Sequence, residues 1–308
     1  MTLIALDPGV QCTLQAAPRI GLRHAGVPAS GPADPVSMAL ANRLVGRAPG
    51  DACLEITYGP ARFRFGAPVQ IGIAGASAPV RVGGIPREPH ATLKVEAGEE
   101  VGIGAATAGA RIYLAVAGDL KADEFLGSRS TYLPAGLGGI EGRALRKGDA
   151  LTFEAAAPVA EVTTPDALRN PPQDSFALRA VPGPDLKDSA DFPWAETFTA
   201  SPRLSRMGVE IMGKLPDRHD AGVMPSAAVF PGTLQATPQG HGFLLLVDGQ
   251  TTGGYPHLLQ VIRADRHLLG QVRPGNRIRF LPRTQARAEE DLRAKQALLE
   301  TWLPGFRL

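Results

Sequence analysis

The residues best suited to chemistry are crowded into one stretch, 248–256, which reads Asp-Gly-Gln-Thr-Thr-Gly-Gly-Tyr-Pro. A short apolar run, 243–247, leads into it and predicts a buried strand. Gly253 and Gly254 would let backbone N–H groups come close to a bound molecule. A loop that only turns needs fewer kinds of polar group. We therefore predict a catalytic or binding site whose members are Asp248, Gln250, Thr251, Thr252, Gly253, Gly254 and Tyr255.

Each polar group suggests a task. Asp248 could position a nucleophilic water or orient a cation, with Thr251 and Thr252 beside it as further catalytic candidates. Gln250, and Gln235 in another polar segment, could bind an amide or a carboxylate. Arg206 could hold a carboxylate or phosphate through two parallel hydrogen bonds.

Two residues of the first half are further substrate-binding candidates. Ser30 lies in a Gly/Pro-rich turn, 26–32. Asn42 lies inside the helix predicted to follow, where it could bond a neighbouring loop, and a solvated helix face would explain it equally well. Several such loops at the strand ends of one barrel could together build a pocket.

Other kinds of site fit the sequence poorly. Residues 208–215 resemble a phosphate-binding P-loop, but Leu215 stands where a Mg²⁺-binding hydroxyl is needed, and the intervening residues alternate like a strand. The six histidines lack metal-ligand spacing, so we expect no metal site. The sequence contains no Gly-x-Ser-x-Gly motif and no lysine between methionines. We therefore expect neither a serine hydrolase nor covalent biotin on this chain.

Composition and charge narrow the class of protein. A formal net charge of +2 is too small to indicate nucleic acid or an anionic membrane as a partner. No apolar run approaches the length of a bilayer span, and the N-terminus lacks the basic region of a signal peptide. Cys12 and Cys53 sit in apolar surroundings, which predicts buried free thiols. The expectation is a soluble cytoplasmic protein.

The elements that must position these residues are mostly strands. The 36 glycines and 28 prolines punctuate the whole chain, as turns between short strands do. One helix is predicted from Pro35, capped by Asp34 and stopped at Gly46, and another spans 285–302. The fold class is therefore all-β with few helices. Strand-like runs occupy 54–58, 62–65, 69–73, 92–95, 111–116, 150–153, 176–181 and 277–280.

The chain divides at a Pro- and Ala-rich linker, residues 155–173. A weak internal echo relates residues 148–153, which close the first half, to residues 275–280, which close the second. We predict a first β-domain over 1–157, a second over 174–284, and a C-terminal helix over 285–308.

Taken together, these segments resemble a known family. The loop 248–256 is similar to the hallmark of the biotin-dependent carboxyltransferase-like family, which includes allophanate hydrolase subunit 2, the C subunit of 5-oxoprolinase and part of the urea carboxylase carboxyltransferase domain. The resemblance extends to about residue 281. Other segments that match the family pattern in order are 26–34, 40–46, 54–55, 127–131, 206–208, 231–235, 264–265 and 270–275.

The resemblance implies a fold and an activity. The fold would be two cyclophilin-like β-barrel domains in tandem. The activity would be that of one component of 5-oxoprolinase, which opens 5-oxo-L-proline to L-glutamate at the expense of ATP. ATP, with Mg²⁺, would be bound in a complex. The partner in that complex would be a B-type 5-oxoprolinase protein, similar to allophanate hydrolase subunit 1, with an A-type protein as a third member.

Two alternatives stay open at this point. The chain could be the carboxyltransferase half of an enzyme acting on urea or a related amide, with its biotin components supplied elsewhere. It could also be a non-catalytic, KipA-like regulatory protein that works by binding a partner.

Overall fold

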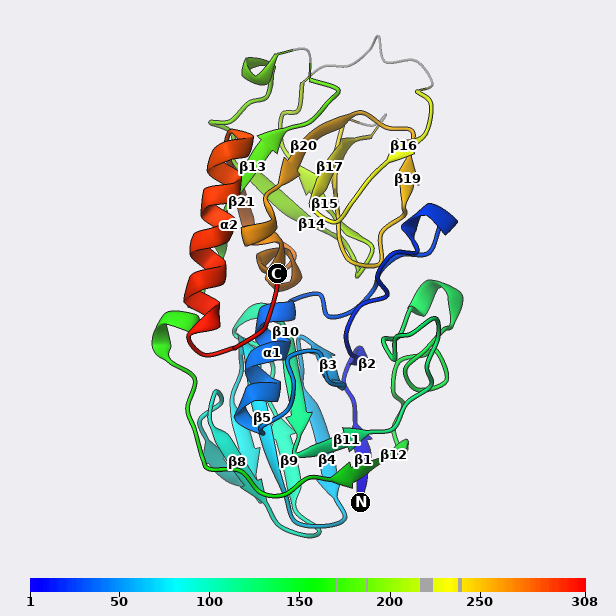
Figure 1. Cartoon of the computed structure of the whole chain (residues 1–308), viewed down its shortest axis with the longest axis vertical. Coiled ribbons are helices and arrows are strands. Elements are labelled where there is room, and N and C mark those ends of the chain that lie inside the picture. The colour runs from blue at the N-terminus through cyan, green and yellow to red at the C-terminus, as the bar shows by residue number, and fades with distance from the viewer. Residues whose placement is uncertain (170, 187, 217–223, 238–239) are drawn as a thin grey trace. The chain divides into compact units, whose positions relative to one another are not determined.

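The computed structural model describes residues 1–169, 171–186, 188–216, 224–237 and 240–308, and most of its regular structure is β (Figure 1). The predicted fold class, all-β with few helices, is confirmed. The chain forms two compact units. The first comprises 1–19, 30–172 and 303–306, and the second comprises 20–29, 173–302 and 307–308. Residues 20–29, which the sequence-based boundary at 157 assigns to the first domain, group with the second unit.

The first unit consists of two antiparallel sheets around one core. Side chains along β4 alternate between the core and the solvent. Phe63 and Phe65 are buried, whereas Arg62 and Arg64 are exposed, so one face of the strand packs into the core. One sheet has the order β11 (Gly118–Leu120), β12 (Ala150–Ala155), β1 (Thr2–Asp7), β4 (Ala61–Phe65), β9 (Glu100–Ile103), β6 (Val80–Val82), β7 (Ile85–Arg87). The other has the order β2 (Cys12–Gln15), β3 (Cys53–Thr57), β10 (Ala108–Val116), β5 (Val69–Ser77), β8 (Thr92–Val95). As predicted, Cys12 and Cys53 are buried free thiols.

Helix α1 (Pro35–Leu44) packs on β5 and β10. It begins as predicted, with the Asp34 carboxylate accepting the Ser37 N–H at 3.0 Å and Pro35 in the first helical turn. The helix comes so close to the sheet that a Cβ at Gly72 would lie 2.3 Å from the Ala41 carbonyl oxygen. Glycine is therefore required at that position of β5.

A buried polar network joins the start of α1 to the sheet below it. The Tyr113 hydroxyl donates to Glu55 Oε2 at 2.7 Å and accepts the Asp34 N–H at 2.8 Å. Glu55 Oε2 also accepts the Ala33 N–H at 2.8 Å. Both Tyr113 and Glu55 are almost fully buried, so these polar groups have no water to replace a lost partner.

Removing the Tyr113 hydroxyl therefore tests the network. Tyr113→Phe should lower the free energy of unfolding by about 1–3 kcal/mol, because the Asp34 N–H and the Glu55 carboxylate each lose a buried partner. Urea unfolding monitored by fluorescence gives the value. Tyr255→Phe is the control, because Tyr255 is 48% exposed. A loss in Tyr113→Phe no larger than in that control would contradict the network's role.

The second unit closes into a barrel. Its core is mostly aliphatic and includes four buried phenylalanines, of which Phe192 and Phe198 both pack against Phe280. The parallel pairing of β13 with β21 closes the ring. The strand order is β13 (Ser175–Pro182), β20 (His257–Val261), β17 (Thr233–Ala236), β18 (Gly242–Leu245), β15 (Gly208–Met212), β14 (Phe198–Leu204), β21 (Arg277–Pro282). Separately, β16 (Ala227–Ala228) pairs with β19 (Thr252–Gly253) in a two-stranded antiparallel sheet.

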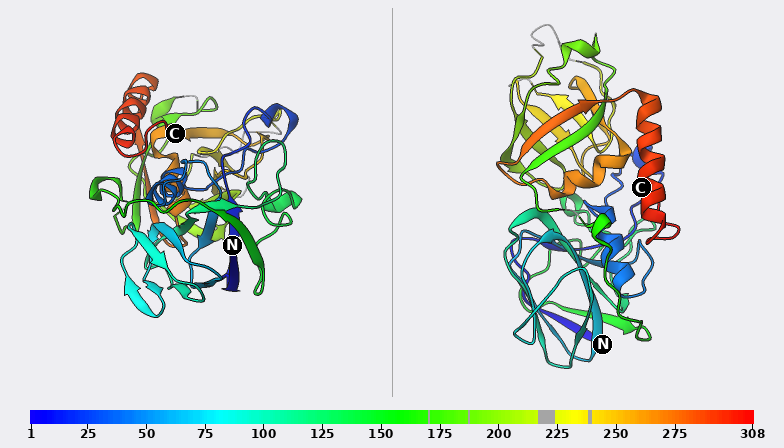
Figure 2. Two further views of the ribbon diagram at one scale, coloured as in Figure 1. Left: turned by 60° about the horizontal axis from the view of Figure 1, so that its bottom comes forward. Right: turned by 90° about the vertical axis from the view of Figure 1, so that its left-hand side faces the viewer.

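Helix α2 (Gln285–Glu300) runs along the outside of this barrel, against β13 and the 3₁₀-helix η5 (Arg263–Gln271) (Figure 2). Within the described residues, no helix has the length and apolar character needed to cross a membrane. The other short 3₁₀ turns are η1 (Arg23–Ala25), η2 (Leu133–Ala135), η3 (Asp166–Leu168) and η4 (Ser189–Asp191).

Candidate functional site

The polar loop 248–256 belongs to the second unit and starts shortly after β18, which ends at Leu245. Its first turn is fixed by backbone bonds: the Asp248 N–H donates to the Arg206 carbonyl at 3.0 Å and the Gly249 N–H to the Leu246 carbonyl at 3.1 Å. Further on, Thr252 and Gly253 form β19. The loop is therefore anchored at its start and near its middle, with Gln250 and Thr251 between the two anchors.

The two charged candidates form a buried ion pair with each other. Arg206 Nε lies 2.8 Å from Asp248 Oδ2, and Arg206 Nη2 lies 3.2 Å from Asp248 Oδ1. The side chains are 3% and 0% exposed. This bidentate geometry holds the 205–208 turn against the loop. In this arrangement the Asp248 carboxylate and the Arg206 guanidinium orient the loop, and neither presents its charge at the surface.

The side chains of the two glutamine candidates, Gln235 and Gln250, are hydrogen-bonded to each other. Gln250 Nε2 donates to Gln235 Oε1 at 3.1 Å, and Gln235 Nε2 donates to the Tyr255 carbonyl at 3.1 Å. Gln235 is fully buried in β17 and supports the loop from inside the barrel unit through these two bonds. A Cβ at Gly253 would lie 2.6 Å from Gln235 Nε2, which explains the glycine there. Within the described residues Gln250 Oε1 has no hydrogen-bond partner, so this oxygen can accept one from a ligand.

Arg23 is a member of this region that the sequence did not reveal. It lies in η1, beside β16 and β19 (Figure 1). Its Nη2 donates to the carbonyls of Val229 and Gln250, the latter at 3.2 Å, and its guanidinium carbon lies 5.2 Å from the Phe230 ring centroid. Burial lowers the pKa of Arg23. A single arginine just before the Gly/Pro-rich turn carries no sequence signal that it binds a loop more than 200 residues away.

The surface of the loop is polar and aromatic. Tyr255 and Phe230 are 48% and 46% exposed, Thr252 is exposed, and Thr251 is nearly buried. Such a surface can bind a small amide by hydrogen bonds to Gln250 and Thr252 and by contact with an aromatic ring. Among the described residues no cluster of three or more His, Cys, Asp or Glu side chains could hold a metal ion.

Ser30 and Asn42 belong to the first unit. Asn42 Nδ2 donates to the carbonyls of Asp51 at 2.8 Å and Pro49 at 3.3 Å, so it fixes the turn that follows α1. Ser30 has a φ of 53°, and its buried hydroxyl has no partner among the described residues. Their assignment to a substrate site stays a prediction.

The hydroxyls of the 127–131 segment, which matched the family pattern, are used internally. Ser130 Oγ donates to the Ala16 carbonyl at 2.8 Å, and Thr131 Oγ1 donates to the Leu14 carbonyl at 2.8 Å. Ser128 Oγ donates to the Ala17 carbonyl at 2.6 Å. The segment therefore fastens a long loop onto β2 and the residues after it.

Comparison with known proteins places these features in a family. Over 296 residues the chain is 31% identical to the C subunit of 5-oxoprolinase from Escherichia coli, covering 94% of this chain and 92% of that protein. It is 30% identical to urea amidolyase of Lachancea kluyveri, covering 97% of this chain and 18% of that protein. The urea amidolyase structure of K. lactis superposes with a TM-score of 0.89 at 25% identity, over 100% of this chain and 20% of that one.

The family model covers most of the chain. The model described as carboxyltransferase domain, subdomain A and B, matches residues 25–282. That range contains the Asp248–Arg206 pair, the hydrogen-bonded pair of Gln235 and Gln250, and the two-stranded sheet of β16 and β19. The resemblance inferred from the sequence is thereby confirmed, and the chain belongs to the carboxyltransferase domain A and B family.

Proposed function

We propose that this chain is the C-type component of an ATP-dependent 5-oxoprolinase, which opens 5-oxo-L-proline to L-glutamate together with partner subunits. The observation that carries the proposal is the nearly end-to-end match with the Escherichia coli C subunit of 5-oxoprolinase, 92% of whose length is aligned. A second such protein, from Haemophilus influenzae, is 30% identical over 89% of each chain. The urea amidolyase match covers less than a fifth of that protein.

The proposed chemistry needs activation. A lactam is resonance-stabilised, so water adds slowly to its carbonyl carbon. Phosphorylation of the lactam oxygen would make that carbon more electrophilic; addition of water and cleavage of the ring C–N bond would then give an acyl phosphate, which a second water would hydrolyse to glutamate and phosphate. ATP with Mg²⁺, bound in the complex, would supply that activation. In this proposal the chain holds the ring: Gln250 Oε1 accepts the lactam N–H, Thr252 bonds the carboxylate, and Tyr255 packs on the ring.

The Asp248–Arg206 pair and Gln235 act through the loop in this proposal. They touch no substrate, but they fix where Gln250 and the backbone of Gly253 and Gly254 lie. Preorganised polar groups of this kind contribute more than groups that must be ordered on binding. Thr251, nearly buried, belongs with these positioning residues.

Activity of the assembled complex tests the function. The chain is co-purified with a B-type partner, similar to allophanate hydrolase subunit 1, and with an A-type protein. ATP-dependent release of glutamate from 5-oxo-L-proline is then measured, with each component omitted in turn. We expect glutamate only when this chain, its partners and ATP are all present. Full activity without this chain would refute the proposal.

A urea-directed carboxyltransferase is the second candidate, and the TM-score of 0.89 with a urea amidolyase structure favours it. Under this alternative the chain would transfer a carboxyl group to urea or a related amide from a biotin carrier on another protein. The same preparation supplied with a biotin carboxylase, its carrier, bicarbonate and urea distinguishes the two. Urea-dependent ATP use in that assay, without glutamate release in the first, selects this alternative.

Removing the Gln250 amide should slow turnover without unfolding the protein. Gln250→Ala should lower kcat/KM about a hundredfold, because the substrate loses one preorganised polar contact. The half-exposed side chain makes little contribution to the core, so the melting temperature should change by less than that of Gln235→Ala. Gln285→Ala, an exposed glutamine on α2, is the matched control. An unchanged kcat/KM in Gln250→Ala would show that Gln250 does not contact the substrate and that the loop serves only as a turn.

A further inference from the structure

Two arginines share one face of η5. Arg263 and Arg266 are three residues apart, and in a 3₁₀-helix side chains at that spacing lie directly above one another. Two like charges one turn apart repel unless acids compensate them. If nearby acids pair with Arg263 and Arg266, their charges are neutralised and the pair has only a structural role. If no acid pairs with them, the two charges can attract a negatively charged ligand.

The nearby carboxylates are already paired with other arginines. Asp265 accepts two bonds from the Arg179 guanidinium, at 2.9 Å and 2.5 Å. Asp291 pairs with Arg179 at 2.6 Å and with Arg283 at 2.9 Å. These bonds leave neither acid to neutralise the η5 arginines.

Arg266 has a neutral partner only. Its Nε donates to the Val261 carbonyl at 3.3 Å, and no carboxylate pairs with it in the part of the chain that the structure describes. Burial, and then the positive charges of Arg263 and Arg23, lower the pKa of Arg266 to about 10. Arg263 is exposed and has no ion-pair partner among the same residues.

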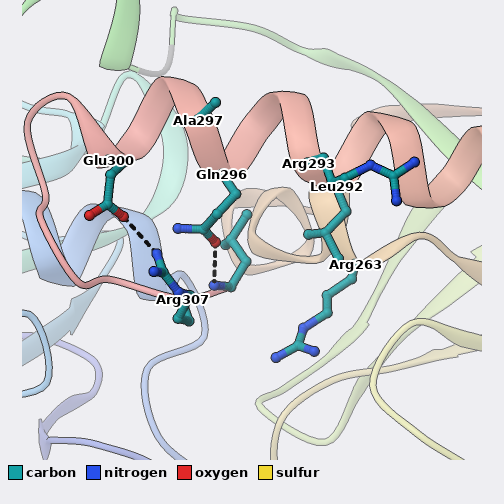
Figure 3. A pocket seen from close by; sticks show the side chains of 8 residues that line it. Arg263, Leu292, Arg293, Gln296, Ala297, Glu300 and Arg307 are labelled. Atoms are coloured by element: carbon teal, nitrogen blue, oxygen red, sulfur yellow. Dashed lines mark hydrogen bonds and ion pairs between the residues drawn. The ribbon is translucent and has the colours of Figure 1, made fainter.

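A cavity of about 680 Å³ opens beside Arg263 (Figure 3). Leu292 and Ala297 of α2 give it an apolar wall, and Arg293, Arg307 and the carboxylate of Glu300 also line it. Arg293 lies 4.0 Å from Glu289. Arg307 is held by Glu300 at 2.6 Å, whereas no hydrogen bond or ion pair joins Arg263 to the other residues drawn in Figure 3. The volume is in the range of sites that hold small molecules.

We propose that this cavity is a binding site for a small phosphate-bearing anion, with Arg263 contacting the anion directly and Arg266 raising the positive potential behind it. The planar guanidinium fork matches the oxygens of phosphate, and two uncompensated cations favour a dianion over a monocarboxylate. The apolar wall would accept the body of the ligand. The site is separate from loop 248–256, so it does not depend on the function proposed above.

Pyrophosphate is the probe that tests the site. The full chain is titrated with sodium pyrophosphate by calorimetry at fixed ionic strength, with inorganic phosphate and citrate as parallel arms. We expect one saturable site for pyrophosphate, weakened about tenfold in Arg263→Gln and less in Arg266→Gln. Arg277→Gln, an exposed arginine on β21, should bind as the unchanged chain does. Thermal unfolding of each variant confirms that it is folded.

Absence of saturable pyrophosphate binding, or equal affinity in Arg263→Gln and the unchanged chain, overturns the proposal. Equal weakening in Arg263→Gln and Arg277→Gln also overturns it, because that result would show attraction by net charge alone. Tighter binding of citrate than of both phosphate probes overturns the assignment to phosphate.

Discussion

Asp248→Ala should lower the free energy of unfolding by about 3–5 kcal/mol, because it leaves the guanidinium of Arg206 buried without its carboxylate. Both bonds of the bidentate pair are lost, and the 205–208 turn loses its link to the loop. Urea unfolding of the full chain measures the change. Activity must be measured well below the melting temperature of the variant, since unfolding alone would abolish it.

A double variant separates charge from packing. Asp248→Leu with Arg206→Met removes both charges together and should recover most of the stability lost in Asp248→Ala. It should not recover activity if the pair orients the loop for a substrate. A loss below about 1 kcal/mol in Asp248→Ala would show that the pair behaves like an exposed surface ion pair.

A second large effect should come from pH, through His90. Its side chain is 9% exposed, and its burial, followed by the charge of Arg169, lowers its pKa to about 4, while Asp34 raises it in part. The unfolded chain binds this proton near pH 6.5 and the folded chain only near pH 4. The stabilisation is therefore complete above pH 6.5 and is lost as pH falls toward 4. This single group should remove about 3 kcal/mol over that window.

Asparagine at position 90 isolates the effect. His90 has a φ of 62°, a conformation that asparagine tolerates, and its backbone bonds to Ile73 and Thr164 should persist. The difference in unfolding free energy between His90→Asn and the unchanged chain should therefore shrink or reverse between pH 7 and pH 4. His24→Asn, at an exposed histidine, is the control. Parallel pH profiles for the unchanged chain and His90→Asn would contradict this account.

Local structure followed closely from local sequence. The Asp34 cap and Pro35 predicted α1, whose observed start is Pro35. The alternation that argued against a P-loop at 208–215 is strand β15, Gly208–Met212. The predicted helix over 285–302 is α2, Gln285–Glu300. In each case the signal lies within a few residues of the element, because capping and side-chain alternation are short-range effects.

The sequence predicted several of the residues that gather at the site but not which of them contact one another. From the sequence, both Asp248 and Arg206 are candidates for binding a ligand. Their ion pair could not be foreseen, because the two residues are 42 positions apart. Gln235 and Gln250 were both predicted to face a substrate, yet one supports the other. Arg23 gave no signal at all. Which polar group is used up internally depends on tertiary contacts, and no local pattern encodes them.

The position of residues 20–29 in the second unit has a consequence for dissecting the gene. A cut within the linker, after residue 172, would separate Arg23 from the Val229 and Gln250 carbonyls that it bonds. The shortest continuous fragment that includes this arginine and the whole barrel begins near residue 20 and so carries most of the first unit with it. A swap of the second unit between relatives would therefore have to transfer residues 20–29 as well as the continuous segment that follows the linker.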